Sequence, residues 1–366
     1  MPETERRQRR AGAWALVLLW ALALTAGLAA GSEGFGWPNG AVSEAAQRTV
    51  LLEIRLPRTL GAGLVGALLG LAGAIAQGLF RNPLADPYLL GTAAGSSVAV
   101  VAVLAAGVAL SSGLGRDGAF GVGQEGAAAI AVQMGGTAWA AETAEALRAL
   151  ADAGIMVAAF TGALLGMVLT LSLARGARHT PRLLLAGVVV GVMLMAVSDL
   201  LTTAFPEALR ARQGFLLGST AYLGWSSVGW LAAGLAVVLP LAWRMARMLD
   251  ALALGEDGAT SLGLDVGRLR LAFVVLLALA TGLAVSQAGL VAFVGLVAPH
   301  IVRRTVTLAH GALLVASAAT GGVLLLAADL AARTVVAPQE LPVGVLTAVI
   351  GGGYLLRLLQ RQERPS

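Results

Sequence analysis

The sequence predicts an all-α integral membrane protein with ten transmembrane helices. Three observations lead to this fold class: 58% of the 366 residues are hydrophobic, only 12% are charged, and the charges fall between long uncharged runs. A soluble domain carries about 25% charged residues, whereas an uncharged run of about 20 residues can cross a bilayer as a helix. Since backbone groups in lipid must bond to one another, the runs are expected to be helical.

The uncharged runs define the spans in chain order. They cover residues 11–32, 59–80, 87–115, 153–174, 183–206 (interrupted only by Asp199), 213–243, 271–302, 311–328 and 341–356. The first run has the basic start and small residues of a secretory signal, but its 22 uncharged residues predict an uncleaved first helix. The run 271–302 has 32 residues, which is long for one helix and short for two.

The placement of arginine resolves that ambiguity. If the chain folds back near residues 287–289, there are ten spans and both termini share one side of the membrane. That side then carries seventeen of the 25 arginines, at positions 6, 7, 9, 10, 81, 175, 178, 182, 244, 247, 268, 270, 303, 304, 357, 361 and 364. Basic residues are enriched in cytoplasmic loops. The sequence therefore predicts a multi-pass membrane protein with both termini cytoplasmic.

Composition and motifs argue against catalysis by this chain. All 25 basic residues are arginine and cysteine is absent, so the lysine of a phosphate-binding loop is missing. The glycine-rich stretch 121–126 has no strand before it, the three histidines have no metal-ligand spacing, and no serine nucleophile motif is present. We expect no catalytic residue, metal or cofactor here; if ATP drives this protein, another subunit binds it. The arginines are scattered, so no nucleic-acid partner is expected.

Two loops stand out. The outward loop 111–152 is expected to hold a small amphipathic helix near residues 140–150. The cytoplasmic segment 250–270 predicts two short helices joined by a glycine turn, which either transmit a push from a soluble partner or simply connect two spans. Asp199 is the one acid well inside a span; it is either functional or solvated near the outer end.

Small residues four positions apart predict close helix packing. Such pairs are Gly66–Gly70, Gly162–Gly166 and Gly187–Gly191, and small residues let helix backbones approach where lipid gives no hydrophobic drive for association. The stretches "GLAGAIAQG" (70–78) and "GLAVSQAG" (282–289) lie in oppositely directed spans. An inverted-topology repeat would produce this echo, and so would chance.

Six motifs in order give the chain a resemblance to a known family. They are "RLPRTLGAGLVGALLGLAGAIAQGLFRNPLADPYLLG" (55–91), "LLLAGVVVG" (183–191), "LALGEDGATSLGLD" (252–265), "AGLVAFVGLVAPHIVRR" (288–304), "AADLAAR" (327–333) and "ELPVGVLTAVIGGGYLLRLL" (340–359). Together they resemble the FecCD-type permeases, the membrane subunits of bacterial ABC importers for iron chelates, haem and vitamin B12. The resemblance implies a type II ABC importer permease in the bacterial inner (cytoplasmic) membrane, with residues 1–366 as one transmembrane permease domain.

The resemblance also implies partners and sites. It implies a homodimer of two permease copies in membrane lipid, two separate ATPase subunits that bind ATP and Mg, and a periplasmic substrate-binding protein. The binding protein would dock on Arg55, Arg58 and Arg333. The cytoplasmic gate would comprise Asn82, Leu84, Thr180 and Pro181, with Pro181 standing where the family often has a small hydroxyl residue. The ATPase-coupling residues would be Leu254, Gly255, Ala259, Leu262 and Gly263.

The function implied is import of an iron chelate, haem or ferric siderophore, from periplasm to cytoplasm. A cobalamin importer is the alternative within the family. A secondary transporter driven by an ion gradient is a further alternative, and it would need paired intramembrane charges, for which only Asp199 is available. The long outward loop and Phe215, where the family commonly has Trp, depart from the family pattern and leave the cargo open.

Overall fold

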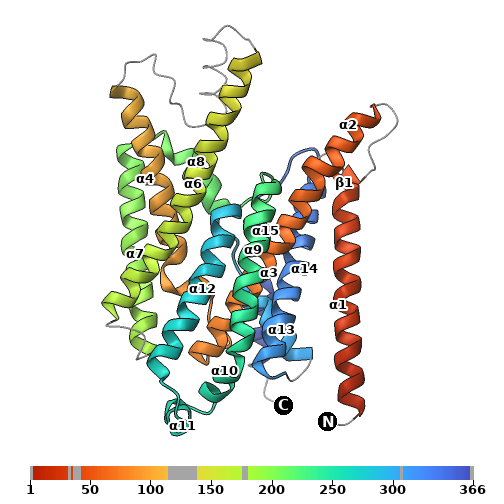
Figure 1. Ribbon diagram of the computed structural model, residues 1–366, viewed down its shortest axis with the longest axis vertical. Coiled ribbons are helices and arrows are strands. Elements are labelled where there is room, and N and C mark those ends of the chain that lie inside the picture. Colours follow the sequence, from red (N-terminus) through yellow and green to blue (C-terminus); the bar gives the residue numbers. More distant parts are fainter. Residues whose placement is uncertain are drawn as a thin grey trace.

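The computed structural model describes residues 3–31, 34–35, 43–113, 138–174, 180–305 and 308–362. This part of the chain is nearly all helical, and the long helices run roughly parallel or antiparallel to one another (Figure 1). The N- and C-terminal ends lie at the same end of the molecule, together with α11, while α2 and the short β pair lie at the opposite end (Figure 1). We call these the terminal end and the far end.

The elements follow in chain order. The long helices are α1 (Glu3–Ala29), α3 (Leu56–Phe80), α4 (Thr92–Gly113), α6 (Ala138–Leu173), α7 (Thr180–Ala204), α9 (Trp225–Arg244), α12 (Val266–Ala288), α14 (His310–Thr334) and α15 (Val343–Gln362). The shorter elements are α2 (Glu44–Thr49), the π-helix η1 (Val50–Arg55), the 3-10 helix η2 (Pro87–Leu90), α8 (Ala208–Leu217), α10 (Ala246–Ala253), α11 (Glu256–Ser261) and α13 (Val294–Thr305). Strands β1 (Ala30–Gly31) and β2 (Gly34–Phe35) pair antiparallel.

Seven helices of the described chain are long and apolar enough to cross a membrane. They are Ala11–Ala29, Glu44–Phe80, Gly154–Leu173, Pro181–Ala204, Trp225–Arg244, Val266–Ala288 and His310–Thr334. The apolar stretches Thr92–Ala106 and Val343–Arg357 are shorter, and α13 has only 12 residues. The helical multi-pass architecture is confirmed, and the count of ten spans stays a prediction.

The predicted break in the run 271–302 is confirmed. Helix α12 ends at Ala288, α13 begins at Val294, and Gly289 between them has a φ of 66°. The non-helical link is tied to its neighbours: the Leu290 N–H donates to the Phe215 carbonyl at 2.9 Å, and the Tyr88 hydroxyl donates to the Val291 carbonyl at 3.1 Å. Irregular backbone at membrane depth must be satisfied by protein, and these bonds supply part of that satisfaction.

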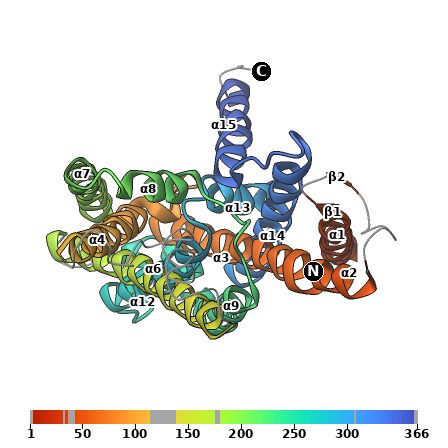
Figure 2. The same cartoon turned by 90° about the horizontal axis from the view of Figure 1, so that it is seen from above.

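Helix α3 is the central element, and Figure 2 shows it crossing the middle of the molecule with α7 and α8 at one edge and α15 projecting from another. A Cβ built at Gly66 would lie 2.3 Å from the Gly321 carbonyl oxygen, and one at Gly70 would lie 2.2 Å from the Ser317 oxygen. Glycine therefore lets the backbones of α3 and α14 touch, as its spacing predicts.

The other two glycine pairs behave differently from each other. Both members of the pair in α6 face α4: a Cβ at Gly162 would lie 2.4 Å from the Gly95 oxygen, and one at Gly166 would lie 2.5 Å from the Gly91 oxygen. In α7 only Gly187 is at a close approach, since a Cβ built there would lie 1.9 Å from the Leu89 oxygen, while a Cβ at Gly191 would meet nothing within 4 Å. Five of the six glycines thus serve the predicted packing.

Helix α1 lies at the periphery, since only 6% of the apolar 18-residue stretch within Ala11–Ala29 is buried. It is held by Trp20, whose indole N–H donates to the Ala319 carbonyl at 2.9 Å. The ring lies against two glycines, because a Cβ built at Gly63 or Gly322 would come within 2.7 or 2.1 Å of it. The indole therefore anchors the first helix to both α3 and α14.

The prediction of helix near residues 140–150 in the outward loop is confirmed, but its extent is wrong. The small helix expected near residues 140–150 is not a separate element, because α6 runs unbroken from Ala138 to Leu173 and contains it. Residues 138–153 contain no proline or glycine, so no strong helix breaker separates them from the fourth span. Figure 1 shows α4 and α6 projecting beyond α7 and α9 at the far end. The rest of the loop, 114–137, lies outside the described residues.

The two halves of the sequence echo lie in α3 and α12, which run in opposite directions (Figure 1). Each half contains a glutamine, Gln77 or Gln287, whose side-chain oxygen is buried and has no hydrogen-bond partner in the described part of the chain. The inverted repeat itself stays a prediction.

Candidate functional site

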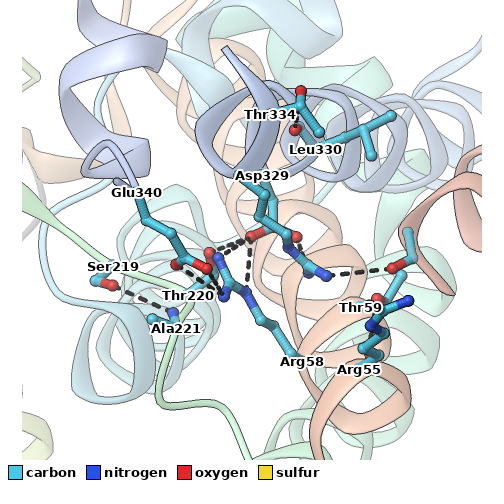
Figure 3. A network of polar contacts seen from close by, with 12 residues as sticks. Arg55, Arg58, Thr59, Ser219, Thr220, Ala221, Asp329, Leu330, Thr334 and Glu340 are labelled. Atoms are coloured by element: carbon cyan, nitrogen blue, oxygen red, sulfur yellow. Dashed lines mark hydrogen bonds and ion pairs between the residues drawn. The ribbon is translucent and has the colours of Figure 1, made fainter. Parts of the chain in front are cut away.

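Five polar side chains meet at the far end of the molecule (Figure 3). We call Arg58, Thr220, Asp329, Arg333 and Glu340 the arginine cluster. One oxygen of Asp329 accepts hydrogen bonds from Nε and Nη2 of Arg58, both at 3.2 Å, and from the Thr220 hydroxyl at 2.6 Å. Its other oxygen accepts from Arg333, and Glu340 pairs with Arg58 Nη1 at 2.9 Å. Asp329 therefore joins α3, α14 and the segment before α9.

The cluster is buried and balanced in charge. Arg58 is 9% exposed, and both Asp329 and Arg333 are 1% exposed. Buried charges are tolerated when they are paired and hydrogen-bonded, and here two guanidinium groups face two carboxylates. The Glu340 side chain, at 28% exposure, is the most accessible of the ionic groups.

Arginines also cap the end of α1. Arg333 Nη1 donates to the Gly27 carbonyl at 3.2 Å, and Arg55 Nη1 donates to the Leu28 carbonyl at 2.9 Å. The last carbonyls of a helix lack intrahelical partners and carry partial negative charge, so the cationic groups satisfy both needs. These contacts connect the first helix to the cluster.

The structure thus brings the three predicted docking residues, Arg55, Arg58 and Arg333, to one end of the molecule. Their docking role stays a prediction, but Arg58 and Arg333 are already paired with internal acids. The sequence does not mark Asp329 and Glu340 as partners of these arginines. The spacing of Asp329 and Arg333 offered a signal, because residues four apart share one helix face.

The turn after α3 contains Asn82 and Leu84, two of the predicted gate residues, and both are exposed. Arg81 ends the helix in a left-handed conformation with a φ of 49°. The Asn82 side-chain oxygen accepts from the Leu84 N–H at 2.9 Å, and an Asp86 oxygen accepts from the Tyr88 N–H at 2.8 Å. Asx bonds of this kind fix turn geometry.

Two prolines add to that stiffness. Pro83 and Pro87 flank the turn, and each fixes its φ and removes one amide donor. Together with the Asx bonds they make the turn stiff, as the sequence predicts. Within this turn, burial raises the pKa of Asp86 to about 6, although the hydrogen bond from Tyr88 lowers it.

The other two gate residues, Thr180 and Pro181, begin α7. Proline is compatible with the first turn of a helix, whose N–H groups lack partners, and Pro181 is exposed. The structure describes a single copy of the chain, which contains both predicted gate segments. Closure of a pore by these segments stays a prediction.

The predicted coupling segment has the expected form. Helices α10 and α11 are short and are joined at Gly255, which has a φ of 107°, and Gly263 follows α11 with a φ of 79°. Leu254 and Leu262 are 74% and 63% exposed, whereas Ala259 between them is fully buried. Two short helices joined by a glycine turn are therefore confirmed, but α10 begins at Ala246, before the predicted segment 250–270. The segment presents apolar side chains to solvent at the terminal end.

Ionic contacts fix this segment to the long helices. Glu256 of α11 pairs with Arg270 of α12 at 2.5 Å. Asp250 of α10 accepts from the backbone N–H of His310 at 3.0 Å and lies 2.6 Å from that residue's ring Nδ1. Burial raises the pKa of Asp250, but the hydrogen bonds and charge of His310 outweigh burial and hold the pKa below its usual value.

Asp199 forms a surface ion pair. Its side chain is 63% exposed and pairs with Arg212 of α8 at 2.5 Å. This exposure favours the alternative that Asp199 is solvated near the outer end of its span, and not part of an intramembrane relay. Among the described residues, no group of three or more His, Cys, Asp or Glu could hold a metal ion.

Comparison with known proteins agrees with the motif pattern. Residues 15–361 match the family model of the FecCD transport family. The chain is 35% identical over 354 residues to the hemin transport system permease protein HmuU of Yersinia pestis, covering 95% of this chain and 94% of that one. It is 35% identical over 362 residues to the vitamin B12 import system permease protein BtuC of Klebsiella pneumoniae, covering 98% and 96%.

A solved structure supports the same fold. A metal-chelate type ABC transporter in an inward-facing conformation superposes with a TM-score of 0.76, at 23% identity, over 95% of this chain and 98% of that one. The chain therefore belongs to the FecCD transport family, and it is a membrane-spanning transport permease subunit rather than an enzyme.

Proposed function

We propose that this chain is the permease of an ATP-driven importer that moves an iron chelate, haem or ferric siderophore, from the periplasm to the cytoplasm. The observation that carries the proposal is the match along nearly the whole chain to a hemin transport permease. The iron(3+)-hydroxamate import permease FhuB of Bacillus subtilis, 36% identical over 86% of this chain, supports the same cargo class. Cobalamin is the alternative, which the match to vitamin B12 permeases favours equally.

The working complex would contain two copies of this chain, two ATPases and a substrate-binding protein. The missing lysine supports a separate ATPase, since this chain cannot form a phosphate-binding loop. Apolar side chains on α7 and α15, such as Leu185 at 66% and Val349 at 69% exposure, offer surfaces that lipid or a second copy would cover. The arginine distribution supports a cytoplasmic location for the terminal end.

The two ends would then have different partners. At the far end, carboxylates of a binding protein would meet Arg55, Arg58 and Arg333, since arginine binds carboxylate bidentately at any physiological pH. Such an acid would compete with Glu340, the accessible internal partner. At the terminal end, the exposed Leu254 and Leu262 would enter the ATPase, and the stiff turn with Asn82 and Leu84 would close the pore with Thr180 and Pro181.

Reconstitution tests the function. Proteoliposomes that contain the permease and its ATPase should hydrolyse ATP faster when a binding protein loaded with haem or a ferric siderophore is added outside, and should accumulate that cargo. The same binding protein without cargo is the control. Stimulation and uptake with cobalamin alone would favour the alternative, and uptake that follows an ion gradient without ATP would contradict the importer.

Docking of the ATPase can be tested at Leu262. Replacing this exposed leucine with aspartate should weaken the ATPase–permease complex by about 2 kcal/mol, roughly 30-fold in affinity, because a charge would enter an apolar contact. The matched control is Val335→Asp, since Val335 is similarly exposed, at 66%, but lies just after α14 at the far end. Co-purification of ATPase with each variant measures the effect. Equal retention by both variants would contradict docking at this segment.

A further inference from the structure

The first residue of α14 contacts the coupling segment through two of its groups. Asp250 of α10 accepts a hydrogen bond from the His310 backbone N–H at 3.0 Å and lies 2.6 Å from the ring Nδ1. The His310 side chain is 13% exposed. The imidazole is therefore held on one edge by α10, and any displacement of that helix acts directly on the ring.

The opposite edge of the ring faces the end of α3. A Cβ built at Gly78 would lie 3.1 Å from His310 Cδ2 and 3.2 Å from Nε2, and 3.5 Å from Cδ1 of the fully buried Leu249. Glycine at this position lets the imidazole lie directly against the backbone of α3. Gly78 precedes Arg81, the residue that ends α3 and begins the stiff turn, by three positions.

The turn between α10 and α11 also approaches the end of α3, at Arg81. A Cβ built at Gly255, in the turn between α10 and α11, would lie 3.7 Å from Nη1 of Arg81. The coupling segment thus approaches the end of α3 at three points: at Gly78 through the His310 ring, at Gly78 through Leu249 of α10 itself, and at Arg81 through the turn before α11.

We propose that His310 is a positioning residue that carries movement of the coupling segment to the gate turn, its imidazole wedged between Asp250 and Gly78. Protein interiors are close-packed and resist compression, so a ring in contact on both edges moves α3 when α10 moves. The inference rests on the proposed function, because it requires an ATPase to move the coupling segment.

A simpler role would be capping alone. A carboxylate at the start of α14 satisfies an unpaired N–H and is favoured by the helix dipole. That role needs the Asp250 carboxylate and the His310 backbone, but not the imidazole or the glycine opposite it. The two roles therefore differ in what His310→Ala should do, since alanine keeps the backbone N–H and removes the ring.

The test uses the reconstituted complex and measures ATP hydrolysed per substrate imported. His310→Ala should leave ATPase association intact but raise this ratio about fivefold, the low end of typical coupling between sites. His310→Asn keeps a donor for Asp250 but leaves the space beside Gly78 empty, so it should also be uncoupled. The matched control is His300→Ala, because His300 stacks edge-on against Tyr354; its ratio should not change.

The glycine supplies an independent arm. Gly78→Ala alone should push the ring away and raise the ratio, whereas Gly78→Ala combined with His310→Ala fills part of the vacated space and should lower the ratio below that of His310→Ala alone. If His310→Ala does not assemble with the ATPase, Gly78→Ala decides the question. Wild-type coupling in Gly78→Ala, or in an assembled His310→Ala, would overturn the proposal. Failure of the proposed function would instead appear as no ATP-dependent import by the wild-type complex.

Discussion

Replacing Asp329 with alanine is expected to lower the free energy of unfolding by about 3–5 kcal/mol, the cost of breaking a buried ion pair from one side. The carboxylate is 1% exposed and is the shared partner of Arg58, Arg333 and Thr220. Without it, Arg333 keeps only the Gly27 carbonyl among the contacts described above, and Arg58 keeps only Glu340. The measurement is the thermal stability of the purified permease in detergent, followed by the fraction that stays monodisperse after heating.

The matched control is Glu340→Gln. Glu340 also pairs with Arg58, but its side chain is 28% exposed, so water can replace it and the loss should stay within about 1 kcal/mol, as for exposed pairs. Equal stability of Asp329→Ala and Glu340→Gln would contradict the central place of Asp329. Partial recovery in Asp329→Leu combined with Arg333→Leu would support it, since apolar replacement of both members of a buried pair is often nearly neutral.

The cluster changes how docking at this end has to be tested. The sequence predicts that these arginines pair with acids on a binding protein, whereas in the structure Arg58 and Arg333 pair with acids of the same chain. A charge reversal at either position would remove a buried ion pair and destabilise the fold, as well as remove any docking contact. Variants of the accessible Glu340 are therefore cleaner probes, because they leave the buried pairs of Asp329 in place.

Much of the fold could be predicted because it depends on local composition. Uncharged runs located the helices, and the arginine distribution placed the reversal near residues 287–289, where α12 ends. The glycines around Ala259 marked the short helices of the coupling segment. The uncharged runs and the glycine turn are signals within about one helix length, on the scale that the bilayer sets, whereas the arginine distribution draws on the whole chain.

The partners of the arginines could not be predicted from such signals. Arg58 meets acids 271 and 282 positions away in the chain, so only the packing of α3 against α14 brings them together. Whether an arginine at a helix end faces inward or outward depends on that packing, not on its neighbours in sequence. The same holds for the His310 ring, whose contacts with Asp250 and Gly78 join three separate helices.

The second large effect is expected at Gly73, which the four-residue glycine spacing did not single out. A Cβ at this position would lie 1.6 Å from the Gly295 carbonyl oxygen and 2.4 Å from its carbonyl carbon. Since that neighbour is backbone, no side chain can rotate away, and α13 must separate from α3. Gly73→Leu should therefore cost more than ordinary overpacking, on the order of 3 kcal/mol or above, and leave little monodisperse permease.

Gly191→Leu is the matched control, because Gly191 also lies in a predicted span but a Cβ there meets nothing within 4 Å. Both variants add the same apolar side chain to a membrane helix and remove one glycine, so helix propensity and hydrophobicity change alike. A difference in Tm and in monodisperse yield then reports the contact with Gly295 alone. That contact places the short helix α13 against α3 directly after the chain reversal. If Gly73→Leu were as stable as Gly191→Leu, the close approach of these two backbones would be wrong, and with it the path of the chain between residues 289 and 305.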